Sequence, residues 1–64
     1  MREAELWHRL EKSLGAGYAR AWSEQVVLAA LGGHTVAEAI KAGQDSKVIW
    51  RAVWEHLELA ARER

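Results

Sequence analysis

The longest apolar run in the chain, Val26–Leu31, has six residues and is followed directly by Gly32 and Gly33. Such a run leaves a helix without a polar face, so the helix must be covered on most sides. Glycine is frequent just beyond helix C-termini because it adopts the left-handed conformation at little cost. The run therefore predicts the C-terminal half of a helix, and we expect this helix to form the buried centre of the fold.

The remaining glycines divide the chain into further segments with helical periodicity. In the first segment, apolar side chains recur at the spacing of one helical stripe: Leu6, Trp7, Leu10 and Leu14. No segment alternates between apolar and polar residues as a half-buried strand does. The predicted helices span residues 2–14, 18–31, 36–42 and 46–60. Together they indicate a single all-α domain over residues 1–64, a small four-helix bundle whose third helix is short.

Both C-terminal helices have recognisable start signals. Thr35 and Glu38 have the spacing of a capping box, in which each side chain accepts a hydrogen bond from the backbone N–H of the other residue. Asp45 is a suitable N-cap for the last helix, and Gly43 marks a tight turn before it. A short capped helix, a turn and a longer amphipathic helix are typical of a helix-turn-helix.

Only part of this segment fits the helix-turn-helix motif. Ala39 is a small residue four before the turn glycine, where the two helices must approach closely. Ile49 is an apolar residue six after that glycine and would pack back onto the first helix. Glu38 and Gln44, however, stand where such motifs usually carry apolar side chains. We therefore expect a helix-turn-helix-like pair that serves packing first.

DNA binding by this pair is the alternative hypothesis. Lys47 and Arg51 lie on the polar surface of the last helix and could contact phosphates or guanine. Glu55 and Glu58 share that surface and would repel the DNA backbone. The chain as a whole also lacks the basic excess typical of nucleic-acid-binding proteins, since nine Lys and Arg residues balance nine Asp and Glu residues.

The small size of the chain limits its core. A domain of 64 residues is expected to be marginally stable, and the absence of cysteine excludes a disulfide scaffold and a thiolate zinc site. Four tryptophans supply large apolar side chains instead. Three of them lie on apolar stripes and are expected in the core: Trp7, Trp22 and Trp50. Trp54 lies at the edge of its apolar arc, and we expect it to be partly exposed.

No pattern in the sequence predicts catalysis. The three histidines, His8, His34 and His56, have no metal-ligand spacing, and residues 15–17 lack the preceding strand and the third glycine of a dinucleotide loop. No hydroxyl residue lies in a nucleophile motif. We therefore expect no enzyme activity, no cofactor, no metal site and no small-molecule ligand. Without a signal peptide or a membrane-spanning run, a soluble cytoplasmic protein is expected.

Nearly end to end, the chain resembles a family of short actinobacterial proteins classed as domain of unknown function 3046. The resemblance rests on these segments, in order: Met1-Arg2, Leu6-Trp7, Tyr18-Ala19-Arg20, Val27-Leu28, Leu31-Gly32-Gly33, Thr35-Val36-Ala37-Glu38-Ala39, Gly43 and Val48-Ile49-Trp50-Arg51-Ala52. Members often carry an apolar residue and an acid–proline pair before the last helix, where this chain has Gln44, Asp45 and Ser46. The family implies a small cytoplasmic helical protein with no established activity.

Members of that family are often encoded beside the regulator of the recombinase RecA. This neighbourhood extends the DNA-binding alternative to a recombination-associated regulatory protein, without implying a mechanism.

The leading hypothesis from the residues themselves is a non-enzymatic module that binds a protein partner or forms a homodimer. Four apolar side chains carry it, because they exceed what one small monomer needs to bury: Val27, Leu28, Leu31 and Trp54.

Overall fold

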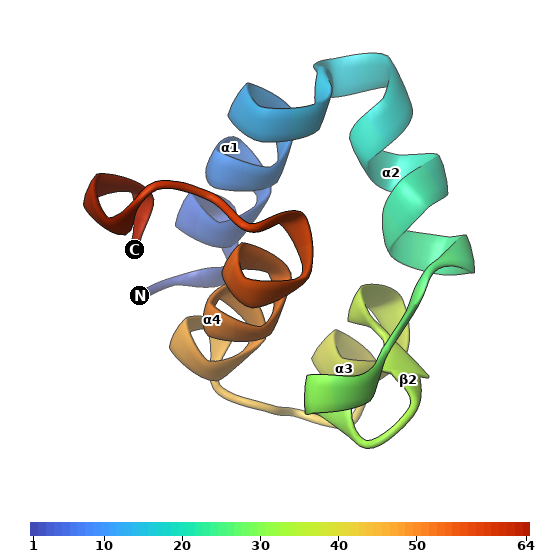
Figure 1. The fold of residues 1–64 in the computed structure, drawn as a ribbon. Helices are drawn as coiled ribbons and strands as arrows, with labels where there is room; N and C mark the ends of the chain where they lie inside the picture. The colour runs from blue at the N-terminus through green and yellow to red at the C-terminus, as the bar shows by residue number, and fades with distance from the viewer.

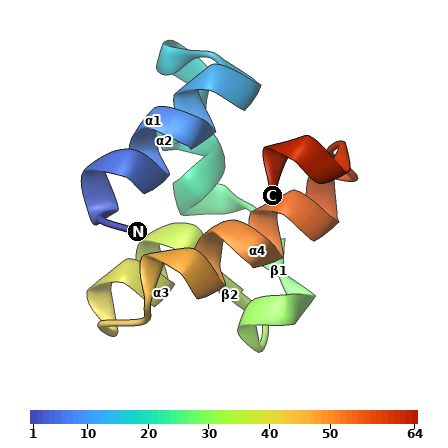
Figure 2. The same ribbon diagram turned by 90° about the vertical axis from the view of Figure 1, so that its left-hand side faces the viewer.

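The structure is a computed structural model that describes all residues 1–64, and it is mostly helical (Figure 1). The elements in chain order are α1 (Glu3–Leu14), α2 (Ala16–Gln25), β1 (Val27–Leu28), η1 (Ala29–Leu31), β2 (His34–Thr35), α3 (Val36–Lys41), α4 (Ser46–Leu57) and η2 (Ala61–Glu63). Helix α1 packs against both α2 and α4, and α3 contacts α2 and α4 (Figure 2). The predicted helical class is therefore confirmed, with the addition of a small two-stranded sheet.

The apolar run Val26–Leu31 is not helical, so the prediction of one helix over residues 18–31 is wrong. Helix α2 ends at Gln25, and Val26 has extended backbone angles, φ −89° and ψ 121°. The next two residues form β1, which pairs antiparallel with β2 in the register Val27 to Thr35. Valine favours extended backbone because its branched Cβ restricts the side chain in a helix.

A tight reversal connects the two strands. After the single turn of η1, Gly32 and Gly33 have positive φ angles of 72° and 83°, a conformation that other residues adopt only with strain. The double glycine thus allows the chain to turn back, so that Leu28 pairs with His34. The double glycine, which the sequence pattern predicts to lie at the end of a helix, instead belongs to the connection between the two paired strands.

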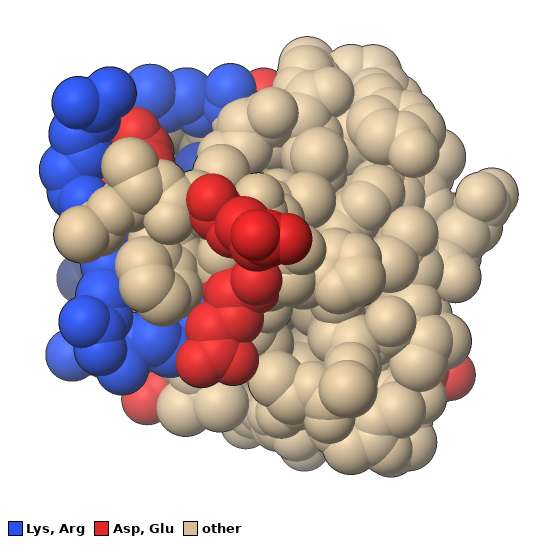
Figure 3. Space-filling model, in the orientation of Figure 1, with Lys and Arg blue, Asp and Glu red and all other residues tan.

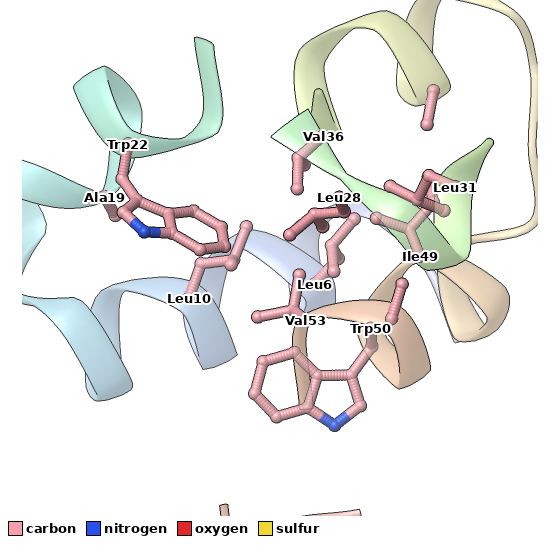
Figure 4. Packing of buried hydrophobic residues seen from close by; sticks show 12 residues of the cluster. Leu6, Leu10, Ala19, Trp22, Leu28, Leu31, Val36, Ile49, Trp50 and Val53 are labelled. Atoms are coloured by element: carbon pink, nitrogen blue, oxygen red, sulfur yellow. The ribbon is translucent and has the colours of Figure 1, made fainter. Parts of the chain in front are cut away.

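The core draws on every layer of the molecule (Figure 4). Its buried hydrophobic residues are Leu6, Leu10, Ala19, Trp22, Leu28, Leu31, Val36, Ala39, Ile49, Trp50, Ala52 and Val53. The predicted central helix does not exist, and the largest fully buried side chain is Trp50 of α4. The core therefore lies among the four helices α1, α2, α3 and α4 and the β1–η1 segment.

The predicted starts of α3 and α4 are confirmed. The backbone N–H of Glu38 donates to Thr35 Oγ1 at 3.1 Å, and the backbone N–H of Thr35 donates to Glu38 Oε1 at 2.8 Å. Before α4, the Oδ1 atom of Asp45 accepts from the backbone N–H of Lys47 at 3.0 Å. These caps satisfy backbone N–H groups that have no partner within the helix.

Beyond α4, the chain folds back across the helix. Helix α4 ends at Leu57 rather than at residue 60, because Glu58 adopts the left-handed conformation with φ 54°. The indole N–H of Trp54 then donates to the carbonyl of Ala60, and that of Trp50 donates to the carbonyl of Glu63, both at 2.9 Å. Residues 58–64, which we call the C-terminal segment, thus cover the tryptophan side of α4.

Candidate functional site

Three apolar residues of the β1–η1 segment lie exposed on the surface. Val27 is 55% exposed, and Ala29 and Ala30 are also exposed. Ala29 and Ala30, together with the buried Leu28, line a shallow groove of about 160 Å³; Val27 precedes these residues in the chain and does not line the groove. We call Val27, Ala29, Ala30 and this groove the η1 surface.

Helix α4 forms the opposite wall of the groove. Its lining residues there are Ala52, Glu55 and His56. The imidazole of His56 meets the indole of Trp22 edge to face, with ring centroids 6.0 Å apart. Because Trp22 is buried in the core, this contact fixes His56 beside the groove.

The η1 surface lies on the least charged side of the molecule. Figure 3 shows that the face formed by α2, β1 and η1 carries almost no charged side chains, whereas Lys and Arg gather on the side of the C-terminal segment. Among the residues that line the groove, Glu55 is the only Asp, Glu, Lys or Arg residue. The arrangement offers apolar contact area and little electrostatic attraction.

The four residues predicted to bind a partner do not form one patch. Val27 is exposed, but Leu28 and Leu31 are only 1% and 4% exposed and belong to the core. Their placement as surface residues is corrected: in the extended strand β1 the side chain of Leu28 lies on the face opposite to Val27, and Leu31 is buried at the end of the η1 turn. Trp54 is half-buried as expected, but its indole is bound to Ala60 beneath the C-terminal segment and does not line the groove.

Sequence reasoning missed Ala29 and Ala30. The assumption of a continuous helix assigned both to the buried stripe, whereas the structure exposes them. Two adjacent valines before a double glycine were the signal that could have revealed the extended segment.

The two residues of the DNA-binding alternative do lie together. Lys47 and Arg51 are exposed and, with Val48, line a shallow hollow of about 160 Å³ on α4. Glu55 is also exposed, one turn further along the same helix. The neighbouring tryptophan side of α4 is occupied by the C-terminal segment.

One titratable group departs from its ordinary behaviour. The pKa of Glu38 lies below its usual value of 4.5, chiefly because its carboxylate accepts the backbone N–H of Thr35 and secondarily because His34 is close. The nearest approach of His34 is 3.5 Å, from Nδ1 to Glu38 Oε1. This cluster serves the start of α3 and lies at the surface, so its role is structural.

No group of at least three histidine, cysteine, aspartate or glutamate side chains is placed to hold a metal ion. None of the helices combines the length and the apolar composition needed to cross a membrane.

Comparison with known proteins identifies the family of the chain. No curated protein and no solved structure matches the sequence. One family model, described as a protein of unknown function (DUF3046), matches residues 1–62. Because this match covers nearly the whole sequence, the chain belongs to the DUF3046 family.

Proposed function

We propose that this protein is a non-enzymatic self-association module in which two copies meet through the η1 surface. The observation that carries the proposal is the exposed apolar stretch of Val27, Ala29 and Ala30 beside a groove, on a face almost free of charge. Contiguous apolar surface of this kind marks interaction sites more often than it occurs by chance on monomers.

Charge favours a second copy as the partner. In a twofold dimer the same patch contacts itself, so a patch with several charges of one sign would repel its own copy. The η1 surface has no such set of like charges, because Glu55 is the only Asp, Glu, Lys or Arg residue that lines the groove. A partner that is strongly acidic or basic would find little complementary charge here.

The dimer interface must extend beyond the groove. A standard interface covers about 800 Å² per partner, which is about a fifth of the 4234 Å² surface of this molecule. The face with few charged side chains continues from η1 onto α2 (Figure 3), so the interface can extend in that direction. We expect a weak association that depends on protein concentration.

The test measures the mass of the protein in solution from about 1 µM to about 1 mM by analytical ultracentrifugation, a range that covers binding free energies of about 4 to 8 kcal/mol. We expect the average mass to rise towards that of a dimer with concentration. Val27→Lys should abolish this rise, because pairing would bring two unpaired lysine charges together in an apolar interface.

Val48→Lys is the matched control. Val48 is 52% exposed, close to the 55% of Val27, but it belongs to α4 and, with Lys47 and Arg51, lines a different hollow. Its variant should associate like the wild type, while circular dichroism shows both variants folded. A wild-type protein that stays monomeric throughout, or equal effects of both substitutions, would overturn the proposal. Binding of a different protein at this surface would do the same.

A second candidate function is DNA binding by α3 and α4 as a helix-turn-helix. It is supported by the exposure of Lys47 and Arg51 together on α4, where side chains of a recognition helix would contact DNA. We expect binding to duplex DNA to weaken about tenfold in Lys47→Ala and in Arg51→Ala, the lower end of the effect of losing one good contact. Fluorescence anisotropy at low salt measures this. If Lys41→Ala on α3 weakens binding equally, or no binding occurs, this candidate is wrong.

A further inference from the structure

A third hollow, of different chemistry, lies between α1 and the C-terminal segment. It has a volume of about 250 Å³, and none of its lining residues is hydrophobic. The lining residues are Glu5, His8, Arg9, Lys12, Arg62, Glu63 and Arg64. We call this hollow the basic cleft, because four Lys and Arg residues there outnumber two glutamates.

The charge of the cleft contrasts with that of the molecule. The whole chain is neutral, with nine basic and nine acidic residues, yet Lys and Arg gather on the side where the C-terminal segment lies (Figure 3). In Figure 2, where the left-hand side of Figure 1 faces the viewer, the C-terminal end lies in front, beside α4. Folding thus concentrates basic charge that the linear sequence distributes evenly.

Arg9 forms a fixed wall of the cleft. Its Nη2 donates to Glu5 Oε2 at 2.9 Å, and its Nη1 donates to the carbonyl of Arg64 at 3.2 Å. The guanidinium also lies 5.6 Å from the ring centroid of the buried Trp50. Because a guanidinium has five N–H donors, Arg9 retains donors for a ligand while its position is held.

Lys12 and Arg62 are the least engaged of the four basic residues. Lys12 is exposed and takes part in none of the ion pairs of the molecule. The only ion pair of Arg62 is with Glu63 at 4.0 Å, and the Arg62 side chain is 88% exposed. An exposed pair this long contributes little, so both side chains can turn to an anion without breaking a strong contact.

We propose that the basic cleft binds the phosphate groups of a nucleic-acid backbone. Guanidinium and ammonium groups are the usual protein ligands of phosphate, and they need no apolar contact to hold it. An acidic peptide would gain most of its binding energy from apolar anchor residues, for which this lining offers no pocket. Backbone contacts position a nucleic acid but do not read its sequence, so the binding is not sequence-specific.

Salt dependence gives the proposal a quantitative form. Each phosphate contact on duplex DNA contributes about 0.9 to the slope of log K against log salt concentration. Contacts by all four basic residues of the cleft therefore predict a slope of about −3.6, since 4 × 0.9 is about 3.6. Glu5 and Glu63 reduce the attraction, so binding is expected only at low salt.

The experiment titrates a fluorescent duplex of arbitrary sequence with the full chain, at salt concentrations from about 20 to about 200 mM, and records anisotropy. The double variant Lys12→Ala/Arg62→Ala should bind at least tenfold more weakly at the lowest salt, and the magnitude of its slope should fall by about 2. Both side chains are exposed, so the fold should persist, which tryptophan fluorescence checks. A second duplex of unrelated sequence should bind equally well.

Lys41→Ala is the control, because it removes one exposed basic residue of α3 that does not line the cleft. Its affinity and slope should match those of the wild type. The proposal is overturned if no binding occurs at about 20 mM salt, or if Lys41→Ala has the same effect as the double variant. It also fails if only Lys47→Ala and Arg51→Ala weaken binding, or if polyglutamate binds and the duplex does not. None of these results bears on self-association, which depends on the η1 surface.

Discussion

The hydrogen bonds between Thr35 and Glu38 show how two side chains determine a helix start. Each side chain accepts the backbone N–H of the other residue, at 3.1 Å and 2.8 Å. Thr35 is also buried, so its hydroxyl must have a partner inside the protein. This pair lies at the junction of β2 and α3 and therefore fixes the direction in which α3 leaves the small sheet.

The lowered pKa of Glu38 predicts a pH dependence of stability. A carboxylate whose pKa is lowered in the folded state stabilises the protein above its unfolded pKa, and this contribution is lost as pH falls through the folded pKa. Glu38→Gln should therefore be less stable than the wild type at neutral pH, and the difference should shrink as the pH falls below 4.5. Urea unfolding of both proteins at several pH values measures the difference. Glu24→Gln, an exposed glutamate of α2, is the control and should show no such trend.

At the scale of the element, the β1–η1 segment is the part that decides the fold. Within six successive apolar residues, two side chains are buried in the core and three are exposed. The pairing of β1 with β2 and the double glycine stabilise this distribution, because they hold the segment in a conformation that buries Leu28 and Leu31 and leaves the residues between them exposed. In a continuous helix, a different set of side chains from this segment would be buried.

The contrast between Leu28 and Val27 gives a direct test of this arrangement. Leu28→Ala should lower the free energy of unfolding by about 2–5 kcal/mol, because it leaves a cavity in the core. Val27→Ala should cost less than about 1 kcal/mol, because Val27 is largely exposed. Thermal and urea unfolding at low protein concentration measure both values without a contribution from association. Similar losses for the two variants would support the helix that the sequence suggested.

For the whole molecule, tryptophan supplies the large apolar groups that a domain without cysteine needs. Trp22 and Trp50 are buried, and the Trp50 indole also binds the C-terminal segment through Glu63. At the edge, the guanidinium of Arg20 lies 4.8 Å from the Trp7 ring centroid, and that of Arg64 lies 5.3 Å from the ring centroid of Trp54. The first contact of this type links α2 to α1, and the second links the last residue of the chain to α4.

The molecule as a whole has two surfaces of opposite character. The η1 surface is apolar and almost uncharged, whereas the basic cleft has no hydrophobic lining residue. If both proposals hold, two copies that pair through the η1 surface would present the basic cleft of each copy to a common ligand. Pairing would then raise the effective concentration of the second cleft once the first is bound.

The sequence alone determined those features that depend on local interactions. The capping box at Thr35, the N-cap at Asp45 and the apolar stripe of α1 involve residues within a few positions of each other, and all three could be read correctly. The helical class follows from the same periodicity. Of the three tryptophans predicted in the core, Trp22 and Trp50 are buried, whereas Trp7 is only partly buried and packs against the core from outside.

Tertiary structure decided the rest. The composition of the run Val26–Leu31 is compatible with a buried helix and also with a strand followed by a turn. Pairing of Val27 and Leu28 with Thr35 and His34 in the folded protein stabilises the strand. The basic cleft likewise joins α1 to residues more than 50 positions away, as the hydrogen bond from Arg9 to Arg64 shows. Such features depend on contacts between distant segments, whose free energies no local pattern in the sequence contains.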